Sequence, residues 1–348
     1  MTMSEIPVID IAPLFDTDAA RRADVDAAIF KAASSIGFMT VVGQPAALSV
    51  GPEARARMLK LFALPPAQQR SLWKRNFAPE NSILYRGWFP LESSKARCRE
   101  GFEFGPDIVR ALPDDGTDDL LYEPTPLPDP AWVPEGWLAT AQAYYLGMED
   151  VGHRLLASVS RGLGIDERIF RDAFDDGIST LRLLHYPRQG PLAEVVDEPP
   201  GRLIDIGGKR VELVSRAHVD SGLLTVLAQC GVPGLQARHA DGRWIDVPPR
   251  DDGFAINFGG LLDRWTGGRV RATSHRVIGV GEQRFSVPFF FEPRPSTLIA
   301  PLPIAGVRPF APFLYGDHLW ATTTQFPENF GLGHLRPAHG PYVDPLTR

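Results

Sequence analysis

The chain has 348 residues, enough for one large domain or two ordinary ones, and its 44% hydrophobic and 22% charged residues are typical of a globular protein that buries a core. Its formal net charge of −6 argues against nucleic acid or an anionic membrane as the main partner. Its two cysteines, Cys98 and Cys230, define no disulfide framework, and no apolar run approaches the roughly 20 residues that span a bilayer. We therefore expect a cytoplasmic protein without a secretory leader; the sequence does not indicate its oligomeric state.

The first half of the chain predicts helices mixed with short strands, from apolar residues that recur at helical spacing and from β-branched runs. In chain order we expect a strand over residues 6–11, a helix carrying the apolar run 25–36, a strand over 38–42, a helix from 52 to the Pro65-Pro66 pair, loops and short strands over 76–134, a long helix over 136–163, and a short helix near 166–174.

The second half predicts short strands separated by Gly and Pro turns. They are expected over 181–186, 223–230, 235–239, 244–247, 254–258, 270–280 and 285–292, with a helical turn after Gly259-Gly260 and a helix near 315–322. Many short strands without intervening helices indicate a sandwich or barrel. We predict an α+β protein with a mainly β core, a double-stranded β-helix (jelly roll), together with an N-terminal helical region and supporting helices.

The expected divisions are an N-terminal helical and loop region over 1–176, a jelly-roll core over 177–300 and a C-terminal extension over 301–348. No long polar linker separates these parts, so we expect one packed unit.

The metal-binding candidates are two histidines and a carboxylate. His218 and Asp220 form an H-x-D triplet, and residues i and i+2 of an extended strand point to the same face. His275 lies in a second strand-like run, and two strands facing each other in a barrel would complete the set. A lone histidine is more often a core or surface residue. Two histidines and one carboxylate, however, form the facial triad of non-haem Fe(II) oxygenases.

An anion-binding pair follows the second histidine. Arg284 is always charged and can meet a carboxylate with two parallel hydrogen bonds. Ser286 lies two residues on and can donate from the same strand face. An R-x-S triplet alone is unspecific, but behind an H-x-D…H set it predicts an acid bound beside the metal.

These motifs, in this order, resemble the isopenicillin N synthase-like branch of the Fe(II)/2-oxoglutarate-dependent dioxygenases, and the resemblance extends from residue 6 to about 293. The matching stretches read IPVID at 6–10, IGFMTVVG at 36–43, GWFP at 87–90, LRLLHYP at 181–187, HVDSGLLTVL at 218–227 and NFG at 257–259. Leu184 departs from the family's frequent asparagine, and Gly260 departs from its acidic residue.

The resemblance implies a dioxygenase that uses Fe(II), O2 and 2-oxoglutarate to hydroxylate, desaturate or cyclise a small molecule, with release of succinate and CO2. It implies that His218, Asp220 and His275 bind the metal. Arg284 and Ser286 would hold the distal carboxylate of 2-oxoglutarate, and Tyr186 would assist them.

Substrate contacts and alternatives stay open at this level. The resemblance places Arg86, Trp88, Phe89, Glu103 and Phe104 over the mouth of the barrel, although plain packing explains them equally well. The segment 188–210 is either a lid or a surface excursion. Two other functions fit: an oxidase of the same fold that uses no 2-oxoglutarate (isopenicillin N synthase-like or aminocyclopropane carboxylate oxidase-like), and a non-catalytic metal-binding module.

Overall fold

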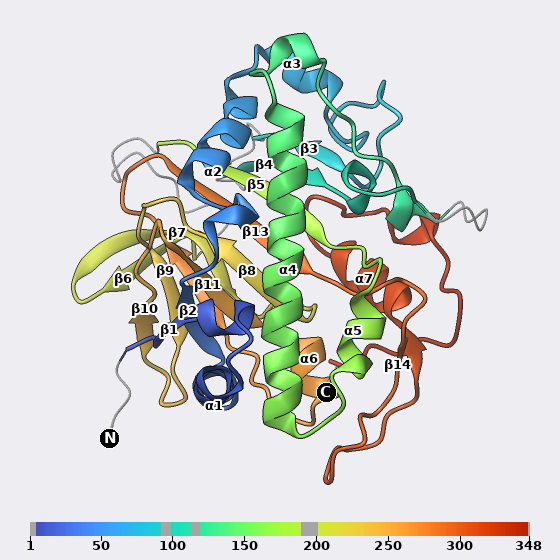
Figure 1. The fold of residues 1–348 in the computed structure, drawn as a ribbon. Helices are drawn as coiled ribbons and strands as arrows, with labels where there is room; N and C mark the ends of the chain where they lie inside the picture. The colour runs from blue at the N-terminus through green and yellow to red at the C-terminus, as the bar shows by residue number, and fades with distance from the viewer. Residues whose placement is uncertain (1–4, 92–98, 113–118, 189–200, 347–348) are drawn as a thin grey trace.

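Two β-sheets enclose the centre of the molecule in a computed structural model that describes residues 5–91, 99–112, 119–188 and 201–346 (Figure 1). The larger sheet contains, in spatial order, β1 (Val8–Asp10), β2 (Phe38–Val42), β11 (Gly253–Phe258), β8 (Leu224–Ala228), β13 (Arg284–Phe291), β5 (Thr180–Tyr186), β4 (Glu100–Phe104) and β3 (Gly87–Phe89). The smaller sheet contains β10 (Trp244–Asp246), β9 (Leu235–Arg238), β12 (His275–Ile278), β7 (Lys209–His218) and β6 (Leu203–Ile206). A separate pair joins β14 (Leu298–Ile299) to β15 (Phe313–Leu314).

The two faces of strand β13 have different roles, one in packing against the helices and one in lining a cavity. Its odd-numbered side chains, Phe289 and Phe291 among them, face the helical layer, where Phe289 meets Tyr145 with ring centroids 5.1 Å apart. Its even-numbered side chains line a cavity. Because alternate residues of a strand point to opposite faces, one strand both anchors the helices and builds the site.

Helices from the first half of the chain cover the outside of the larger sheet (Figure 1), whereas the last helix contributes Leu319 and Thr323 to the lining of the cavity. In chain order, the helices are α1 (Ala19–Ser35), α2 (Pro52–Met58), α3 (Pro66–Ser71), α4 (Trp137–Leu163), α5 (Arg168–Phe174), α6 (Gly260–Trp265) and α7 (Tyr315–Thr323). The long α4 crosses the sheet and packs against α1, α2 and β13. It approaches closely at Gly152, where a Cβ atom would lie only 2.7 Å from the Phe291 ring, so a larger residue there would push the helix off the strand.

Most predicted elements are confirmed, including the strand 38–42 and the helices near 136–163, 166–174 and 315–322. The Pro65-Pro66 pair follows the end of the helical segment that starts at Pro52, as predicted, but Pro66 also begins α3, which was not predicted, because proline suits the first turn of a helix. One boundary was wrong by several residues. The strand expected over 270–280 begins only at His275.

The segment 188–210 lies partly outside the described residues, which resume at 201. The described part forms the start of a hairpin, with β6 paired to a ten-residue β7 that runs on to His218. Neither strand was predicted. The lid function of 188–210 stays a prediction.

The first 176 residues are joined to the rest through the larger sheet. Strand β2 pairs with β11, and β4 pairs with β5, so N-terminal strands flank the core strands on both sides. One hydrophobic cluster extends from Ile9 to Leu332. The division into three parts stays a prediction. Within the described ranges, no helix has both the length and the apolar character to cross a membrane.

Candidate active site

The structure brings His218, Asp220 and His275 together at one end of the smaller sheet. His218 ends β7, His275 begins β12, and the two are directly paired across these antiparallel strands with ring centroids 4.3 Å apart. Asp220 lies just beyond the end of β7, and the potential ligand atoms of the three residues all lie within 4.8 Å of one another. The histidines therefore stand on neighbouring strands of one sheet rather than on the facing strands expected from the sequence.

Hydrogen bonds orient each of the three side chains. The Nδ1 atoms of His218 and His275 lie 2.7 Å and 3.2 Å from the carbonyl oxygens of Arg216 and Thr273. Since a ring N–H donates to a carbonyl, each Nε2 is left with a lone pair. The Nε2 atoms lie 3.5 Å and 3.7 Å from Oδ1 of Asp220. Neutral imidazoles oriented by backbone carbonyls are the usual arrangement of metal-binding histidines.

Hydrogen bonds also orient the carboxylate of Asp220. Oδ2 of Asp220 accepts hydrogen bonds from Thr225 Oγ1 (2.6 Å) and Asn257 Nδ2 (2.7 Å), which leaves Oδ1 toward the histidines. Burial alone would raise the pKa of Asp220, but the neighbouring His275 and His218 hold that pKa well below its ordinary value. Asp220 is thus ionised at neutral pH, as a metal ligand must be. Two imidazoles and one carboxylate fit ferrous iron.

The anion-binding pair lies on the larger sheet, opposite the metal ligands. Arg284 begins β13 and is paired with Tyr186 of β5, with its guanidinium carbon 5.0 Å from the centre of the Tyr186 ring. Arg284 is only 4% exposed, yet its Nε and Nη2 atoms have no hydrogen-bond partner among the described residues. Buried donors of this kind are rare in folded proteins. Ser286, which is also buried, shares the strand face. The set fits a carboxylate ligand.

Tyr186 completes this part of the site. Burial would raise the pKa of its phenol, but the positive charges of Arg99 and Arg284 and a hydrogen bond with Ser286 lower that pKa below its ordinary value. The hydroxyl is therefore polarised by the same cations that would attract an acid. Leu184, two residues earlier on β5, offers no polar contact.

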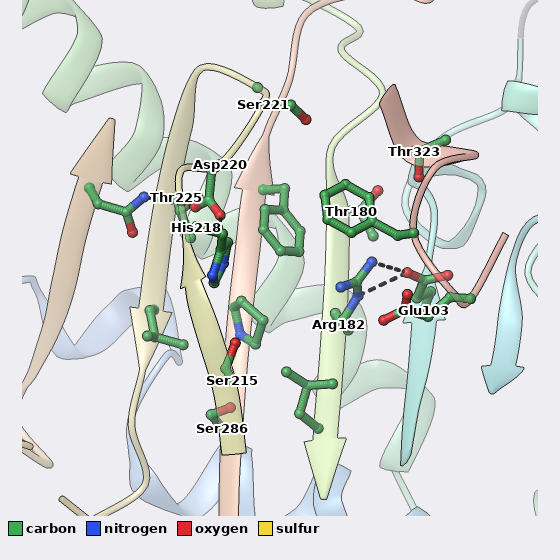
Figure 2. Close-up of a pocket in the computed structure, with 18 of the residues that line it drawn as sticks. Glu103, Thr180, Arg182, Ser215, His218, Asp220, Ser221, Thr225, Ser286 and Thr323 are labelled. Atoms are coloured by element: carbon green, nitrogen blue, oxygen red, sulfur yellow. Dashed lines mark hydrogen bonds and ion pairs between the residues drawn. The ribbon is translucent and has the colours of Figure 1, made fainter. Parts of the chain in front are cut away.

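Both groups open into one cavity of about 170 Å³ between the two sheets. By the measure that one water needs roughly 10–15 Å³, this is room for on the order of ten waters, enough for small organic molecules. Figure 2 shows His218, Asp220 and Thr225 on one side of the cavity, with Arg182 and Glu103 on the other.

The residues predicted to contact substrate are placed differently. Arg86, Trp88, Phe89 and Phe104 are fully buried and are not among the residues that line the cavity. Arg86 donates to Thr180 Oγ1 (2.7 Å), which does line it. The structure thus gives these four side chains a packing role. Glu103 does line the cavity.

Sequence reasoning missed several residues of the site. Thr225 and Asn257 orient Asp220. Arg99, Arg182, Glu292 and Glu328 line the cavity. Strand alternation could have identified some of them, because the even-numbered residues from Thr180 to Tyr186 and from Arg284 to Glu292 all face the cavity. No comparable signal exists for Glu328, which reaches the site from the C-terminal segment.

Comparisons with known proteins support the same interpretation of this site. The family model of the 2OG-Fe(II) oxygenase superfamily matches residues 179–293, and that of the non-haem dioxygenase in morphine synthesis N-terminal region matches 6–130. The 2-oxoglutarate-Fe(II) type oxidoreductase hxnY of Emericella nidulans is 30% identical over 85% of this chain and 82% of its own length. The isopenicillin N synthase of Lysobacter lactamgenus is 30% identical over 91% of this chain and 94% of its own.

The chain belongs to the 2OG-Fe(II) oxygenase superfamily. It is a non-haem iron dioxygenase of the isopenicillin N synthase-like branch, with Fe(II) as cofactor and 2-oxoglutarate and O2 as co-substrates.

Solved structures confirm the jelly-roll fold. A full-length Neurospora crassa protein in complex with α-ketoglutarate and thymine has a TM-score of 0.74 at 22% identity, and the alignment covers 94% of this chain and 99% of that one. A dioxygenase for auxin oxidation from Arabidopsis thaliana, in complex with 2-oxoglutarate, has a TM-score of 0.60 at 19% identity and covers 84% of this chain and 94% of that one.

Proposed function

We propose that this dioxygenase oxidises a small organic molecule bound in the cavity between the sheets, by hydroxylation, desaturation or ring closure, while 2-oxoglutarate is converted to succinate and CO2. His218, Asp220 and His275 hold Fe(II), and Arg284, Ser286 and Tyr186 hold the distal carboxylate of 2-oxoglutarate. The observation that carries this assignment is the pair of buried, unpartnered donors on Arg284, which lie across one cavity from the three potential metal ligands.

Residues of the two sheets have different roles in the proposed reaction. The smaller sheet supplies the metal ligands, with Asp220 ionised and each histidine oriented through Nδ1. The larger sheet supplies Arg284, which fixes one end of an elongated acid so that its other end reaches the metal. Bound iron supplies the activation of dioxygen that is coupled to oxidative decarboxylation of 2-oxoglutarate.

The walls of the cavity favour a small substrate. Leu184, Leu224, Pro288 and Phe290 give it apolar surface that excludes water from the reacting groups. The solved Neurospora relative binds thymine, a molecule of the size that this cavity accepts. An oxidase that dispenses with 2-oxoglutarate is not favoured, since the relatives include enzymes named for 2-oxoglutarate and solved complexes that contain it.

The test is succinate formation from 2-oxoglutarate by the purified chain with Fe(II) in air, alone and with a panel of small molecules. We expect slow succinate release that a true substrate accelerates, and none in the His218→Ala variant. Full turnover in His218→Ala would place the metal elsewhere. The absence of any succinate from the wild type, across the panel, would contradict the proposal.

A further inference from the structure

The half of the cavity opposite the metal ligands is charged. Figure 2 shows Thr180, Arg182, Glu103 and Thr323 gathered there, from β5, β4 and the end of α7, while His218 and Asp220 lie across the cavity. Arg99 and Glu328 line the same cavity. Buried charges are unfavourable unless they are paired, so the pairing of each group decides what it can still bind.

Most of these charges are satisfied by one another. Glu103 accepts from Lys74 Nζ at Oε2 (2.5 Å) and from Arg182 Nε at Oε1 (2.8 Å). Lys74 also donates to Asn329 Oδ1 (2.8 Å). Both oxygens of Glu103 are therefore occupied, and this cluster forms a fixed wall of the cavity.

Glu328 differs from its neighbours because half of its carboxylate is unused. Its side chain is 5% exposed, and Oε1 accepts from Arg99 Nη2 at 3.1 Å. Oε2 is buried and receives no hydrogen bond from any residue of the described ranges. Burial would raise the pKa of Glu328, but the charges of Arg99 and Arg182 lower that pKa to about 2, so the carboxylate is ionised at neutral pH. A buried anionic oxygen without a donor is unfavourable, and a ligand that donates to it removes the penalty.

The surrounding charges restrict what the donor can be. The guanidinium groups of Arg99 and Arg182 would repel an ammonium ion, and Glu328 itself would repel a carboxylate. A neutral N–H avoids both repulsions. This points to an amide-like nitrogen rather than to an amine or an acid.

Two threonines indicate an acceptor on the same ligand. Thr180 Oγ1 accepts from Arg86 Nη1 (2.7 Å), and Thr323 Oγ1 accepts from Asn329 Nδ2 (3.0 Å). Neither hydroxyl donates to another described residue, so each keeps a proton for a group in the cavity that both line. A carbonyl oxygen is the neutral acceptor that accompanies an amide N–H.

We propose that Glu328 is a specificity-determining residue that accepts a hydrogen bond from an N–H of the primary substrate. The substrate is a neutral cyclic amide or imide whose carbonyl oxygen receives protons from Thr180 and Thr323. Apolar walls at Leu319, Phe290 and Phe326 suit a flat ring of this kind. The inference rests on the proposed function, because it assumes that 2-oxoglutarate occupies the Arg284 end of the cavity.

The experiment compares N–H compounds with their N-methyl counterparts. The full chain, loaded with Mn(II) and 2-oxoglutarate under argon, is titrated calorimetrically with uracil against 1,3-dimethyluracil and with glutarimide against N-methylglutarimide. One hydrogen bond to a charged group corresponds to about a tenfold difference in Kd or more. We expect the wild type to prefer the N–H forms by about that factor.

Glu328→Gln is the informative variant. Arg99 donates to Oε1, so it selects the amide oxygen of a glutamine and leaves the NH2 group where Oε2 stood. A donor would then face the substrate's N–H, and we expect the preference for N–H compounds to disappear. Thr323→Val, which replaces the hydroxyl with a methyl group of similar size, should weaken both members of each pair alike. Glu53→Gln, at an exposed carboxylate on α2, is the matched control and should bind like the wild type.

The outcomes separate this inference from the proposed function. Failure of the wild type to bind 2-oxoglutarate contradicts the proposed function. If 2-oxoglutarate binds, the inference is overturned by any of three results: no cyclic amide binds at millimolar concentration, the N-methyl forms bind as well as the N–H forms, or Glu328→Gln keeps the wild-type preference. A loss of 2-oxoglutarate affinity in Glu328→Gln as large as the loss for the N–H compounds also overturns it, because Glu328 would then act only by holding Arg99.

Discussion

Replacing Arg284 by methionine should weaken 2-oxoglutarate binding without destabilising the ligand-free protein. Methionine approximates the apolar stem of the side chain but removes the guanidinium. In the ligand-free wild type, the buried Nε and Nη2 atoms lack partners among the described residues, and each such donor destabilises a fold by about 1–3 kcal/mol. The stacking of the guanidinium on Tyr186 offsets part of this destabilisation, by about 0.5–1 kcal/mol. We therefore expect the free energy of unfolding of ligand-free Arg284→Met to equal or exceed that of the wild type.

When 2-oxoglutarate is present, the wild type should instead have the higher free energy of unfolding. Two charge-assisted hydrogen bonds of about 1.5 kcal/mol each correspond to roughly a 100-fold rise in Kd when both are lost. At a 2-oxoglutarate concentration of about 100 times the wild-type Kd, binding stabilises the wild type by about 2.7 kcal/mol. The same concentration would stabilise the variant by only about 0.4 kcal/mol.

The assay is urea unfolding followed by tryptophan fluorescence, with Mn(II) present and with or without 2-oxoglutarate. Arg250→Met is the control, because Arg250 is an exposed arginine paired with Asp252 at 2.7 Å and should leave the ligand effect unchanged. An Arg284→Met variant that 2-oxoglutarate stabilises as much as the wild type would refute the reasoning. A ligand-free variant that unfolds several kcal/mol more easily would show that Arg284 is a structural residue.

Three further predictions concern a metal ligand, a buried carboxyl group and a buried ion pair. His218→Ala should bind at least about tenfold less Mn(II) or Fe(II) in equilibrium dialysis, whereas His334→Ala, outside the metal cluster, should bind as the wild type does; equal binding by both would contradict the metal assignment. Burial raises the pKa of Glu292 from 4.5 to about 7, so the folded state holds a proton that the unfolded state releases, and stability should fall by up to roughly 3 kcal/mol as pH rises from about 4.5 to 7. Urea unfolding across this range should show a flatter profile for Glu292→Gln, and parallel profiles would contradict the assignment. Arg336→Met should lower the free energy of unfolding by about 3–5 kcal/mol, because it leaves the buried Asp119, which Arg336 contacts at 2.7 Å and 2.8 Å, without its partner; a change below about 1 kcal/mol would show that solvent reaches this pair.

The chemistry of the site was more predictable than its architecture. The H-x-D triplet, the distant histidine and R-x-S are local patterns, so their residue types and spacing could be recognised without knowing how the strands pair. The positions of these residues relative to one another in the fold could not be recognised in the same way. His218 and His275 are paired neighbours on one sheet, and Arg284 lies on the other sheet. Strand order depends on long-range pairing, which a single sequence does not encode locally.

The missed residues have a similar cause. Asn257 reaches Asp220 because β11 pairs with β8 in the larger sheet, and Arg99 and Glu328 meet across 229 positions of sequence. For Trp88 the sequence left substrate contact and plain packing equally open. In the structure, Trp88 lies on β3 at the edge of the larger sheet and is fully buried. Tertiary packing, rather than composition, decided between contact and core in each case.

The most direct test of the central claim is a visible spectrum recorded without oxygen. Fe(II) and 2-oxoglutarate, added anaerobically to the full chain, should together produce a weak charge-transfer band that neither produces alone. His218→Ala should give no band, and Arg284→Met should need roughly 100-fold more 2-oxoglutarate to reach half of it. No band in the wild type at saturating concentrations of both would contradict the claim that this site holds 2-oxoglutarate on iron.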